Sequence, residues 1–397
     1  MEKKRIVHID FSGPWTENMT YQENLLPDAM AEDGNEVFLL VPCYEWNNGK
    51  ISKVSIGNKK MDSGVEVRRY EFSQFGLKKD FLARKLRYVP RLVDILEELN
   101  PDVIMLHCPQ TMVGIDICKY MKKHKEKFLV IDTHSDYFNS ATSFISKYFL
   151  HRILYRYIAR RLGKYAKYIY YITSETREFY IKEYGAGKNE FKYLPLGGKI
   201  LLESEYLKYR QEVRTNLGMD ENEILFLHSG KINKKKRTDQ LINSFYKANN
   251  KNSRLVILGT CDDEMKPLIE ELLNDNSNKG NVQYMGWQKG DALLKYLCAA
   301  DVYCQPGSQS ATFQNAICCK CAVISYPHEA YKEGYVDGNG MWAEDEEELT
   351  RAIEFVILQP EELINMKRCS EKIAKEKLDY VTQSRMILND CYGEVID

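Results

Sequence analysis

A cluster of positive charge follows one apolar run in the second half of the chain. The run Ile224–His228 is followed by Gly230, and then Lys231, three further lysines and Arg237 occur within seven residues. Lysines at the carboxyl end of a parallel strand can contact the phosphate groups of a ligand held over that sheet. Solvated surface loops also carry such runs of charge, so the spacing alone leaves both interpretations open.

Two further segments carry side chains that could bind a ligand. Residues Gln305–Ala316 place small hydroxyl residues between a predicted strand and a predicted helix, where hydroxyls and free backbone N–H groups can bind an anion. His134 follows the apolar run Phe128–Asp132, where an imidazole can exchange a hydrogen bond with a ligand. An ordinary helix N-cap and a structural histidine are the alternative interpretations.

The elements that must position these residues are short apolar strands separated by amphipathic helices. This alternation predicts parallel sheets covered on both faces, which bind ligands beyond the carboxyl ends of their strands. The predicted strands are Arg5–Asp10, Val37–Pro42, Val65–Phe72, Val103–His107, Phe128–Asp132, Tyr168–Thr173, Lys192–Leu196, Ile224–His228, Leu255–Leu258, Val282–Met285, Val302–Gln305 and Ala322–Ser325.

Amphipathic patterns predict the helices Phe81–Leu99, Ser143–Lys164, Thr238–Ala248, Asp263–Leu273, Asp291–Ala299 and Thr312–Cys319. The two blocks of alternation predict an α/β fold of two doubly wound, Rossmann-like domains. We place the boundary at Gly197-Gly198, which gives an N-terminal domain over 1–198 and a C-terminal domain over 199–378.

Composition excludes several classes of protein. The 397 residues are 44% hydrophobic and 28% charged, which excludes a disordered or fibrous chain. No apolar run reaches the roughly 18 residues of a membrane span, and the start of the chain does not resemble a secretion signal. The 11 cysteines are an odd number without regular spacing, so we expect reduced thiols and a cytoplasmic protein.

Several motifs of doubly wound and metal-dependent enzymes are absent. The chain has no GxGxxG fingerprint after a predicted strand, no P-loop and no DxD pair. These absences argue against a dehydrogenase, an NTPase and a metal-bound nucleotide-sugar site. The cluster Cys318–Cys321 lacks a second ligand pair at zinc spacing, so we expect core cysteines and no metal.

Charge is unevenly distributed along the chain. Residues 1–200 hold 32 Lys and Arg and 25 Asp and Glu, a net +7, and the rest of the chain has a net −8. No acid occurs in Tyr137–Ser174, a basic, aromatic-rich segment whose helix near 143–167 could contact an anionic membrane. We expect its apolar face to pack on the sheet and its basic face to be exposed. No motif for nucleic-acid recognition accompanies this charge, so we expect no nucleic-acid partner.

The order of these motifs resembles the GT-B glycosyltransferases of the retaining family-4 type, the group 1 glycosyltransferases, over nearly the whole chain. Gly230, Lys231 and Lys236 are similar to the family's G-R-x4-K phosphate motif, with lysine in the arginine's place. The other similar segments are Tyr193–Gly198, Tyr209–Gly218, Asn281–Trp287, Ala300–Pro306 and Gly338–Trp342. The resemblance implies two facing domains with a deep cleft between them. It also implies an acceptor site in the first domain, a donor site in the second, and a C-terminal helix, 379–397, that returns to the first.

The resemblance also implies roles for individual residues. Lys231 and Lys236 would bind the donor diphosphate and stabilise the charge that develops as the nucleotide leaves, without a metal. His134 would face the transferred sugar, and Gly13 lies in the first strand-to-helix loop, which in this family approaches the donor phosphates and the acceptor. The implied donor-binding residues are Gly13, Gly230, Trp287, Ser308, Gln309, Ser310, Thr312 and Asn315.

The donor loop departs from the family pattern of two glutamates eight residues apart. Asn315 stands at the second glutamate and Gly307 at the first. An asparagine offers one acceptor oxygen where a carboxylate offers two. The identities of the sugar and the nucleotide therefore stay open.

These features together predict a glycosyltransferase that moves a sugar from a nucleotide sugar, expected to be UDP-linked, to a glycan or lipid-linked acceptor. Surface polysaccharide or glycan biosynthesis at the inner face of the membrane is the expected setting. One alternative is a nucleotide-sugar epimerase of the same fold, which would need carboxylates as acid and base. The other is a non-catalytic nucleotide-sugar-binding scaffold subunit, which the missing glutamates motivate.

Overall fold

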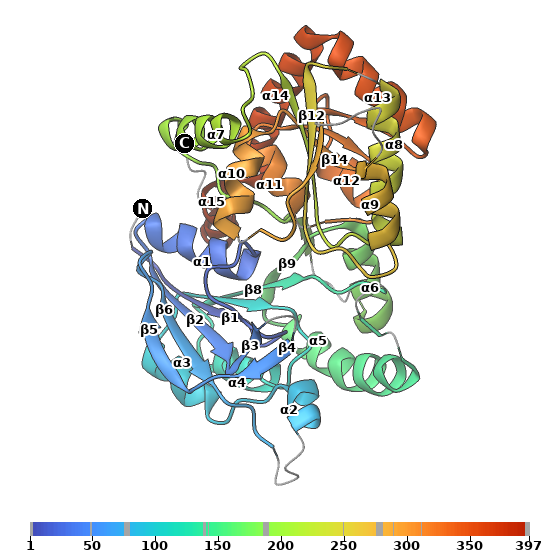
Figure 1. Cartoon of the computed structure of the whole chain (residues 1–397). Coiled ribbons are helices and arrows are strands. Elements are labelled where there is room, and N and C mark those ends of the chain that lie inside the picture. The colour runs from blue at the N-terminus through green and yellow to red at the C-terminus, as the bar shows by residue number, and fades with distance from the viewer. Residues whose placement is uncertain are drawn as a thin grey trace. The chain divides into compact units, whose positions relative to one another are not determined.

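The computed structural model describes residues 3–47, 50–74, 80–137, 140–141, 143–185, 190–248, 250–274, 281–288, 290–310 and 312–393. The chain divides into two compact units, each with its own parallel sheet (Figure 1). Unit 1 comprises Met1–Pro195 and Tyr380–Asp397, and unit 2 comprises Leu196–Asp379.

An eight-stranded sheet in the order β10-β9-β8-β7-β1-β2-β6-β5 forms the centre of unit 1. Its strand pairs are parallel except for β5 with β6. The strand order reverses between β1 and β7, and ligands of doubly wound sheets bind outside the carboxyl ends at such a point. The strands are β1 (Arg5–Ile9), β2 (Glu36–Pro42), β5 (Gly57–Lys60), β6 (Glu66–Tyr70), β7 (Val103–His107), β8 (Phe128–Thr133), β9 (Ala166–Tyr171) and β10 (Glu190–Tyr193).

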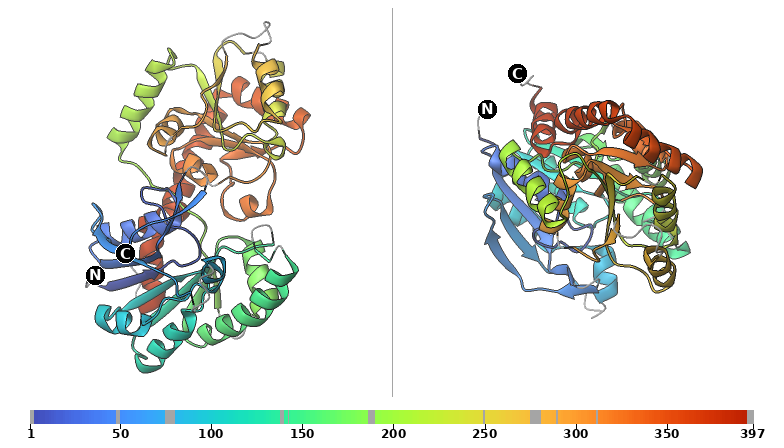
Figure 2. Two further views of the ribbon diagram at one scale, coloured as in Figure 1. Left: turned by 60° about the horizontal axis from the view of Figure 1, so that its bottom comes forward. Right: turned by 45° about the horizontal axis from the view of Figure 1, so that its top comes forward.

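Helices cover both faces of this sheet because its central strands are buried along nearly their whole length. Helices α3, α4 and α5 pack on one face, and α1 and α15 pack on the other. Figure 2 shows the red helix α15 among the blue elements of this unit. The helices are α1 (Gln22–Glu32), α2 (Asp80–Leu86), α3 (Leu92–Leu99), α4 (Gly114–Lys123), η1 (Ser146–Tyr155), α5 (Arg156–Leu162), α6 (Ser174–Tyr184) and α15 (Tyr380–Tyr392), beside a hairpin of β3 (Tyr44–Asn47) and β4 (Lys50–Lys53).

A six-stranded parallel sheet in the order β13-β12-β11-β14-β15-β16 forms the centre of unit 2. Here the strand order reverses between β11 and β14. The strands are β11 (Ile224–Ser229), β12 (Ser253–Leu258), β13 (Val282–Tyr284), β14 (Val302–Gln305), β15 (Ala322–Ser325) and β16 (Gly340–Trp342). The helices are α7 (Glu203–Asn216), η2 (Lys234–Lys236), α8 (Thr238–Ala248), α9 (Lys266–Asn274), α10 (Gly290–Ala299), α11 (Thr312–Cys318), α12 (Glu329–Gly334), α13 (Glu346–Leu358), α14 (Pro360–Ile373) and η4 (Ala374–Leu378).

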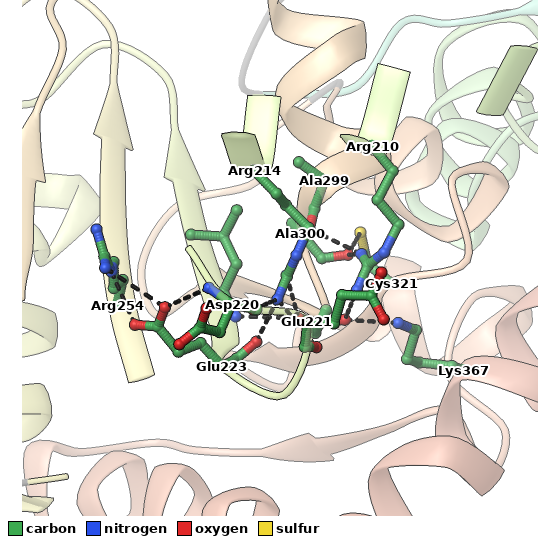
Figure 3. A network of polar contacts seen from close by, with 12 residues as sticks. Arg210, Arg214, Asp220, Glu221, Glu223, Arg254, Ala299, Ala300, Cys321 and Lys367 are labelled. Carbon is green, nitrogen blue, oxygen red and sulfur yellow. Dashed lines mark hydrogen bonds and ion pairs between the residues drawn. The ribbon is translucent and has the colours of Figure 1, made fainter. Parts of the chain in front are cut away.

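A buried charge network connects α7 to the start of β14 in unit 2 (Figure 3). The Asp301 carboxylate accepts hydrogen bonds from Arg210 Nη2 at 2.7 Å and Lys367 Nζ at 2.6 Å. It also accepts hydrogen bonds from Arg214 Nη1 at 3.1 Å and from the Leu225 backbone N–H at 3.0 Å. Burial opposes its charge, but Lys367 and Arg210 lower the pKa of Asp301 to about 2. The carboxylate is therefore ionised and fully partnered at neutral pH.

Each predicted strand overlaps a strand of the structure, and other features differ from the expectations. The single helix expected over Phe81–Leu99 is two helices, α2 and α3, because Pro90 lacks an N–H donor and restricts the preceding residue. Arg87 and Arg91 flank this break with φ angles of 54° and 60°. The strands β3, β4, β5 and β16 were not predicted, since they are only three or four residues long. None of the helices in the described part of the chain has the length and apolarity that crossing a membrane requires.

The basic, aromatic helix expected near 143–167 forms as η1 and α5, but its apolar side chains do not all pack on the sheet. Ile158 and Leu162 of α5 are buried in the core, whereas Phe149 is 57% exposed and Ile153 is 62% exposed. The expectation that the apolar face is covered therefore holds for Leu154 and Tyr155 of η1 and is wrong for its exposed side chains. The reason is local, because α5 packs against α4 while η1 contacts mainly its neighbours α5 and α6.

Candidate active site

The reversal point of unit 2 brings together two of the loops that sequence analysis singled out. Strands β11 and β14 pair directly, with Leu227 opposite Tyr303. The loop with Gly230 and Lys236 leaves β11, and the loop with Ser308 leaves β14 at the same edge. A ligand over this edge would contact both loops.

The two loops approach each other through their backbones. The Ser308 N–H donates to the Lys235 carbonyl at 2.8 Å. A Cβ atom added to Gly307 would lie only 2.1 Å from that carbonyl oxygen, so no side chain fits at this position. The acid of the family pattern therefore has no space at position 307. Gly230 has a φ of 135°, a conformation that side chains rarely adopt, and it too lies against Lys236.

Lys236 is the charged group built into this edge. Its side chain is 7% exposed, and Nζ donates to the carbonyls of Ser308 at 3.1 Å and Gln309 at 2.9 Å. An ammonium has three donors, so one N–H remains for a ligand. Burial lowers the pKa of Lys236 to about 8, which keeps the group largely charged at neutral pH.

Lys231 has a different environment from the one that the resemblance implies. Its Nζ forms an ion pair with Asp262 Oδ1 at 3.0 Å, and its side chain is 65% exposed. The structure therefore presents Lys236 as the anchored cation and Lys231 as a surface residue engaged with an acid. A bound diphosphate would compete with Asp262 for Lys231.

The remaining residues expected at the donor site line the start of α11 or lie beyond β13. The Ser310 N–H donates to the Tyr331 hydroxyl at 2.9 Å, and Ser310 Oγ accepts from the Thr312 N–H at 3.3 Å. These two backbone donors are engaged within the loop, so an anion bound at the start of α11 would have to compete with their present partners. Asn315 is half-buried, with Oδ1 beside Gly198, and Trp287 is 64% exposed in the segment after β13.

The reversal point of unit 1 holds a buried cluster of histidines and carboxylates. His107 ends β7 and donates from Nδ1 to Asp132 Oδ2 at 2.7 Å. His134 Nε2 lies 3.2 Å from the same oxygen, and the ring of His8 stacks on His107 with ring centres 5.3 Å apart. His107 and Asp132 are register partners in β7 and β8, which places the cluster at the carboxyl edge of the sheet.

Mutual charge effects set the protonation of this cluster. Burial opposes charge on Asp132, yet His107 and His134 hold the pKa of its carboxyl well below its ordinary value. Burial also opposes charge on His134, but Asp132 raises its pKa to about 9, so the imidazole is protonated at neutral pH. Burial and the neighbouring Glu23 raise the pKa of Asp10 to about 6. A protonated His134 can donate a hydrogen bond to a ligand oxygen.

The same cluster could hold a metal ion. The ligand atoms of His107, Asp132 and His134 lie within 4.8 Å of one another. Two imidazoles and a carboxylate are a common ligand set for transition metals. His107 donates to Asp132, and His134 forms an ion pair with the same carboxylate, so a bound ion would replace these contacts.

The sequence analysis singled out only His134 of this cluster. Asp10 follows β1, His107 ends β7, and Asp132 lies in β8, so each stands at a strand's carboxyl end, as His134 nearly does. That shared position is a signal in the sequence, but the strand order is needed to show that β8, β7 and β1 are neighbours. Gly13 lies in the loop after β1, with open space where its Cβ would be.

Residues 209–375 match the family model of the group 1 glycosyl transferases. An uncharacterized glycosyltransferase of Methanocaldococcus jannaschii is 26% identical over 215 residues, 51% of this chain and 50% of that protein. The chain thus matches about half the length of this curated relative.

Solved structures share the fold over nearly the whole chain. Sucrose-phosphate synthase of Thermosynechococcus elongatus superposes with a TM-score of 0.66 at 14% identity, over 98% of this chain and 100% of that one. HepE of Anabaena in complex with UDP and glucose superposes with a TM-score of 0.62 at 14% identity, over 98% of this chain and 100% of that one. The catalytic domain of starch synthase IV of Arabidopsis thaliana, bound to ADP and acarbose, superposes with a TM-score of 0.67 at 12% identity. This match covers 98% of this chain and 99% of that one. The two parallel-sheet units therefore form the GT-B fold.

Proposed function

Because residues 209–375 match the model of the group 1 glycosyl transferases and the chain has the GT-B fold, we propose that this protein transfers a sugar from a UDP-sugar to a glycan or lipid-linked acceptor. The observation that carries the proposal is the buried Lys236 ammonium, held at the reversal point of the unit 2 sheet. The structural relative HepE is described in complex with UDP and with UDP-glucose, which supports uridine as the donor base. Surface polysaccharide biosynthesis is the setting we propose.

The proposed reaction breaks the bond between the sugar C1 and the diphosphate oxygen and forms a bond from C1 to an acceptor oxygen. The acceptor hydroxyl loses its proton to the leaving phosphate. Lys236 donates to the diphosphate, and this fixed positive charge stabilises the negative charge that develops as UDP leaves. Protonated His134 hydrogen-bonds a hydroxyl of the transferred sugar. Retention of the anomeric configuration and independence of a metal ion are part of this proposal.

A transfer assay tests the proposed function. UDP release from UDP-glucose, UDP-galactose and UDP-N-acetylhexosamines is measured with and without a glycan or lipid-linked acceptor. We expect acceptor-dependent UDP release that EDTA leaves unchanged, because Lys236 supplies the positive charge. If EDTA abolishes activity and zinc restores it, metal independence is wrong and the cluster of His107, Asp132 and His134 becomes the ligand set to test.

A scaffold subunit is the second candidate, because Gly307 and Asn315 stand where the family pattern has glutamates. A scaffold would bind UDP-sugars without releasing UDP, whatever acceptor is supplied. Nucleotide binding without turnover across an acceptor panel would therefore favour the scaffold over the transferase.

We also propose that an anionic membrane surface is a partner of unit 1. The side chains of Ile145, Phe149, Ile153 and Tyr157 recur every four residues from the residue before η1 into α5, and all four are between 49% and 68% exposed. Steps of four residues keep side chains on one face of a helix. The helix lies at the periphery of its unit (Figure 2).

Positive charge flanks this exposed apolar stripe. Arg156, Arg160 and Arg161 have no ion pair with any carboxylate in the described part of the chain. Arg156 and Arg160 donate instead to backbone carbonyls of α6. An apolar stripe with flanking arginines fits a bilayer whose headgroups are anionic. Arg152 contributes less, because it pairs with Glu183 at 2.9 Å.

Vesicle co-sedimentation tests this membrane surface. We expect binding to phosphatidylglycerol vesicles, weak binding to phosphatidylcholine vesicles, and loss of binding at high salt. The double variant Phe149→Ser, Ile153→Ser should lower the partition coefficient at least about tenfold, since two large apolar side chains no longer insert. Leu202→Ser is the matched control, because Leu202 is 76% exposed but lies outside the helix. Equal binding by the double variant and the control would exclude this surface.

A further inference from the structure

Two cavities of unit 1 share one wall. The first has a volume of about 290 Å³ and the second about 310 Å³. Both are lined by Ser12, Lys85 and Arg87. A ligand that fills both cavities would therefore pass these two cations.

The first cavity is mostly polar. Four serine hydroxyls, the amide of Gln110 and the imidazole of His134 line it, together with the shared Lys85 and Arg87. No aspartate or glutamate is among its described lining residues. Such a wall suits hydroxyl-rich and anionic groups.

The second cavity is mostly apolar. Four aromatic side chains line it, and Gly13 lines it too. Arg84 also lines it, but this guanidinium pairs with Asp80 at 2.9 Å. The apolar lining residues are Phe11, Tyr44, Ile51, Phe72 and Phe81.

The two shared cations contact neutral groups, a backbone carbonyl for Arg87 and an aromatic ring for Lys85. Neither Lys85 nor Arg87 forms an ion pair with a carboxylate among the described residues. Arg87 Nη1 donates to the Gln110 carbonyl at 3.0 Å, and the Arg87 carbonyl accepts from Thr111 Oγ1 at 2.7 Å. Arg87 has a φ of 54°, and such strained backbone is typical of functional sites. Lys85 Nζ lies 5.6 Å from the ring centre of Phe81.

We infer that the acceptor is an anionic amphiphile, a lipid phosphate or diphosphate, whose phosphate binds Lys85 and Arg87. Its apolar chain occupies the cavity lined by the aromatic residues, and its polar head occupies the cavity lined by His134. This inference rests on the proposed function, and it narrows the acceptor to one chemical class. A neutral glycan would leave the two cations without an anionic partner and the apolar cavity unfilled.

Calorimetric titration of the full chain tests the inference with three probes. Farnesyl diphosphate carries both the anion and the apolar chain. Pyrophosphate carries only the anion, and octyl glucoside carries an apolar chain without any phosphate. We expect farnesyl diphosphate to bind at least about tenfold more tightly than either of the others. Equal affinity for pyrophosphate would show a simple anion site and would overturn the inference.

Point variants assign the binding to this wall. Lys85→Ala should weaken farnesyl diphosphate binding about tenfold and leave UDP affinity unchanged. Phe81→Ala, at a side chain that is 67% exposed, should weaken farnesyl diphosphate and leave pyrophosphate unchanged. Lys122→Ala, an exposed lysine of α4, is the control and should change neither. If Lys85→Ala weakens UDP instead, the wall belongs to the donor and the inference is wrong.

UDP titration separates this inference from the proposed function. Binding of UDP without farnesyl diphosphate would contradict the lipid phosphate and leave the transferase in place. A protein that binds farnesyl diphosphate but binds no nucleotide would contradict the transferase. The role of the wall as an acceptor site would then be wrong as well.

Discussion

Replacing Lys236 by alanine should lower the kcat/KM of sugar transfer by about 10²–10³-fold, the loss typical for removal of one fixed donor to a developing anion. The expected effect is large because Nζ is buried and held by two carbonyls, at 3.1 and 2.9 Å, so its charge needs no reorganisation during the reaction. Initial rates of UDP release as a function of donor concentration measure this effect.

Two neighbours in the same loop serve as controls for Lys236. Lys235→Ala removes an exposed cation and should change kcat/KM less than about twofold, since an exposed charge contributes little. Lys231→Ala should have an intermediate effect, because its ammonium is shared with Asp262. Parental activity in Lys236→Ala, or an equal loss in Lys235→Ala, would contradict the role of this lysine. The pKa of about 8 also predicts that UDP affinity falls as the pH rises above that value and the ammonium loses its proton.

Replacing Asp301 by alanine should lower the free energy of unfolding of unit 2 by about 3–5 kcal/mol, the usual cost of removing one partner of a buried ion network. The variant leaves Arg210, Arg214 and Lys367 without the carboxylate that partners them at 2.6–3.1 Å. Figure 3 shows how these cations converge from α7 and α14. Urea unfolding followed by circular dichroism measures the change.

Asp263→Ala is the matched control for Asp301, because it removes an exposed carboxylate and should change the stability by less than about 0.5 kcal/mol. The contribution of Asp301 also depends on pH. Its folded pKa of about 2 lies below the ordinary value of 3.8, so the stabilisation is complete above about pH 4 and is lost as the pH falls toward 2. An Asp301→Ala variant as stable as the control would contradict this account of the network.

The sequence predicted the strands well because buried parallel strands are continuous apolar runs, such as Val103–His107. The sequence did not predict the helix break at Pro90, because the apolar periodicity continues through this residue. The segments Tyr209–Gly218 and Ala300–Pro306 were recognised only by their similarity to the family, and the sequence assigned them no structural role. The structure shows that Arg210, Arg214 and Asp301 of these segments form the ion network that holds α7 to the sheet.

The sequence singled out site residues only where a local pattern marks them. Lys236 belongs to a run of cations that matches the family's phosphate motif, and His134 lies just beyond an apolar strand. The pairing of Lys231 with Asp262 joins two loops, and the cluster of His107 with Asp132 joins two strands, so neither can be read from local spacing. The cations Lys85 and Arg87 lie on and just after a helix far from any motif, and only the cavities reveal them.

Nucleotide binding tests the central claim most directly. The melting temperature of the full chain is measured with UDP, GDP, ADP and CMP, for the parent and for Lys236→Ala. A ligand at 100 times its dissociation constant stabilises the folded state by about 2.7 kcal/mol, so we predict a rise of a few degrees with UDP in the parent and a smaller rise in the variant. No shift with any nucleotide, or the same shift in both proteins, would contradict the assignment of a UDP-sugar donor to Lys236.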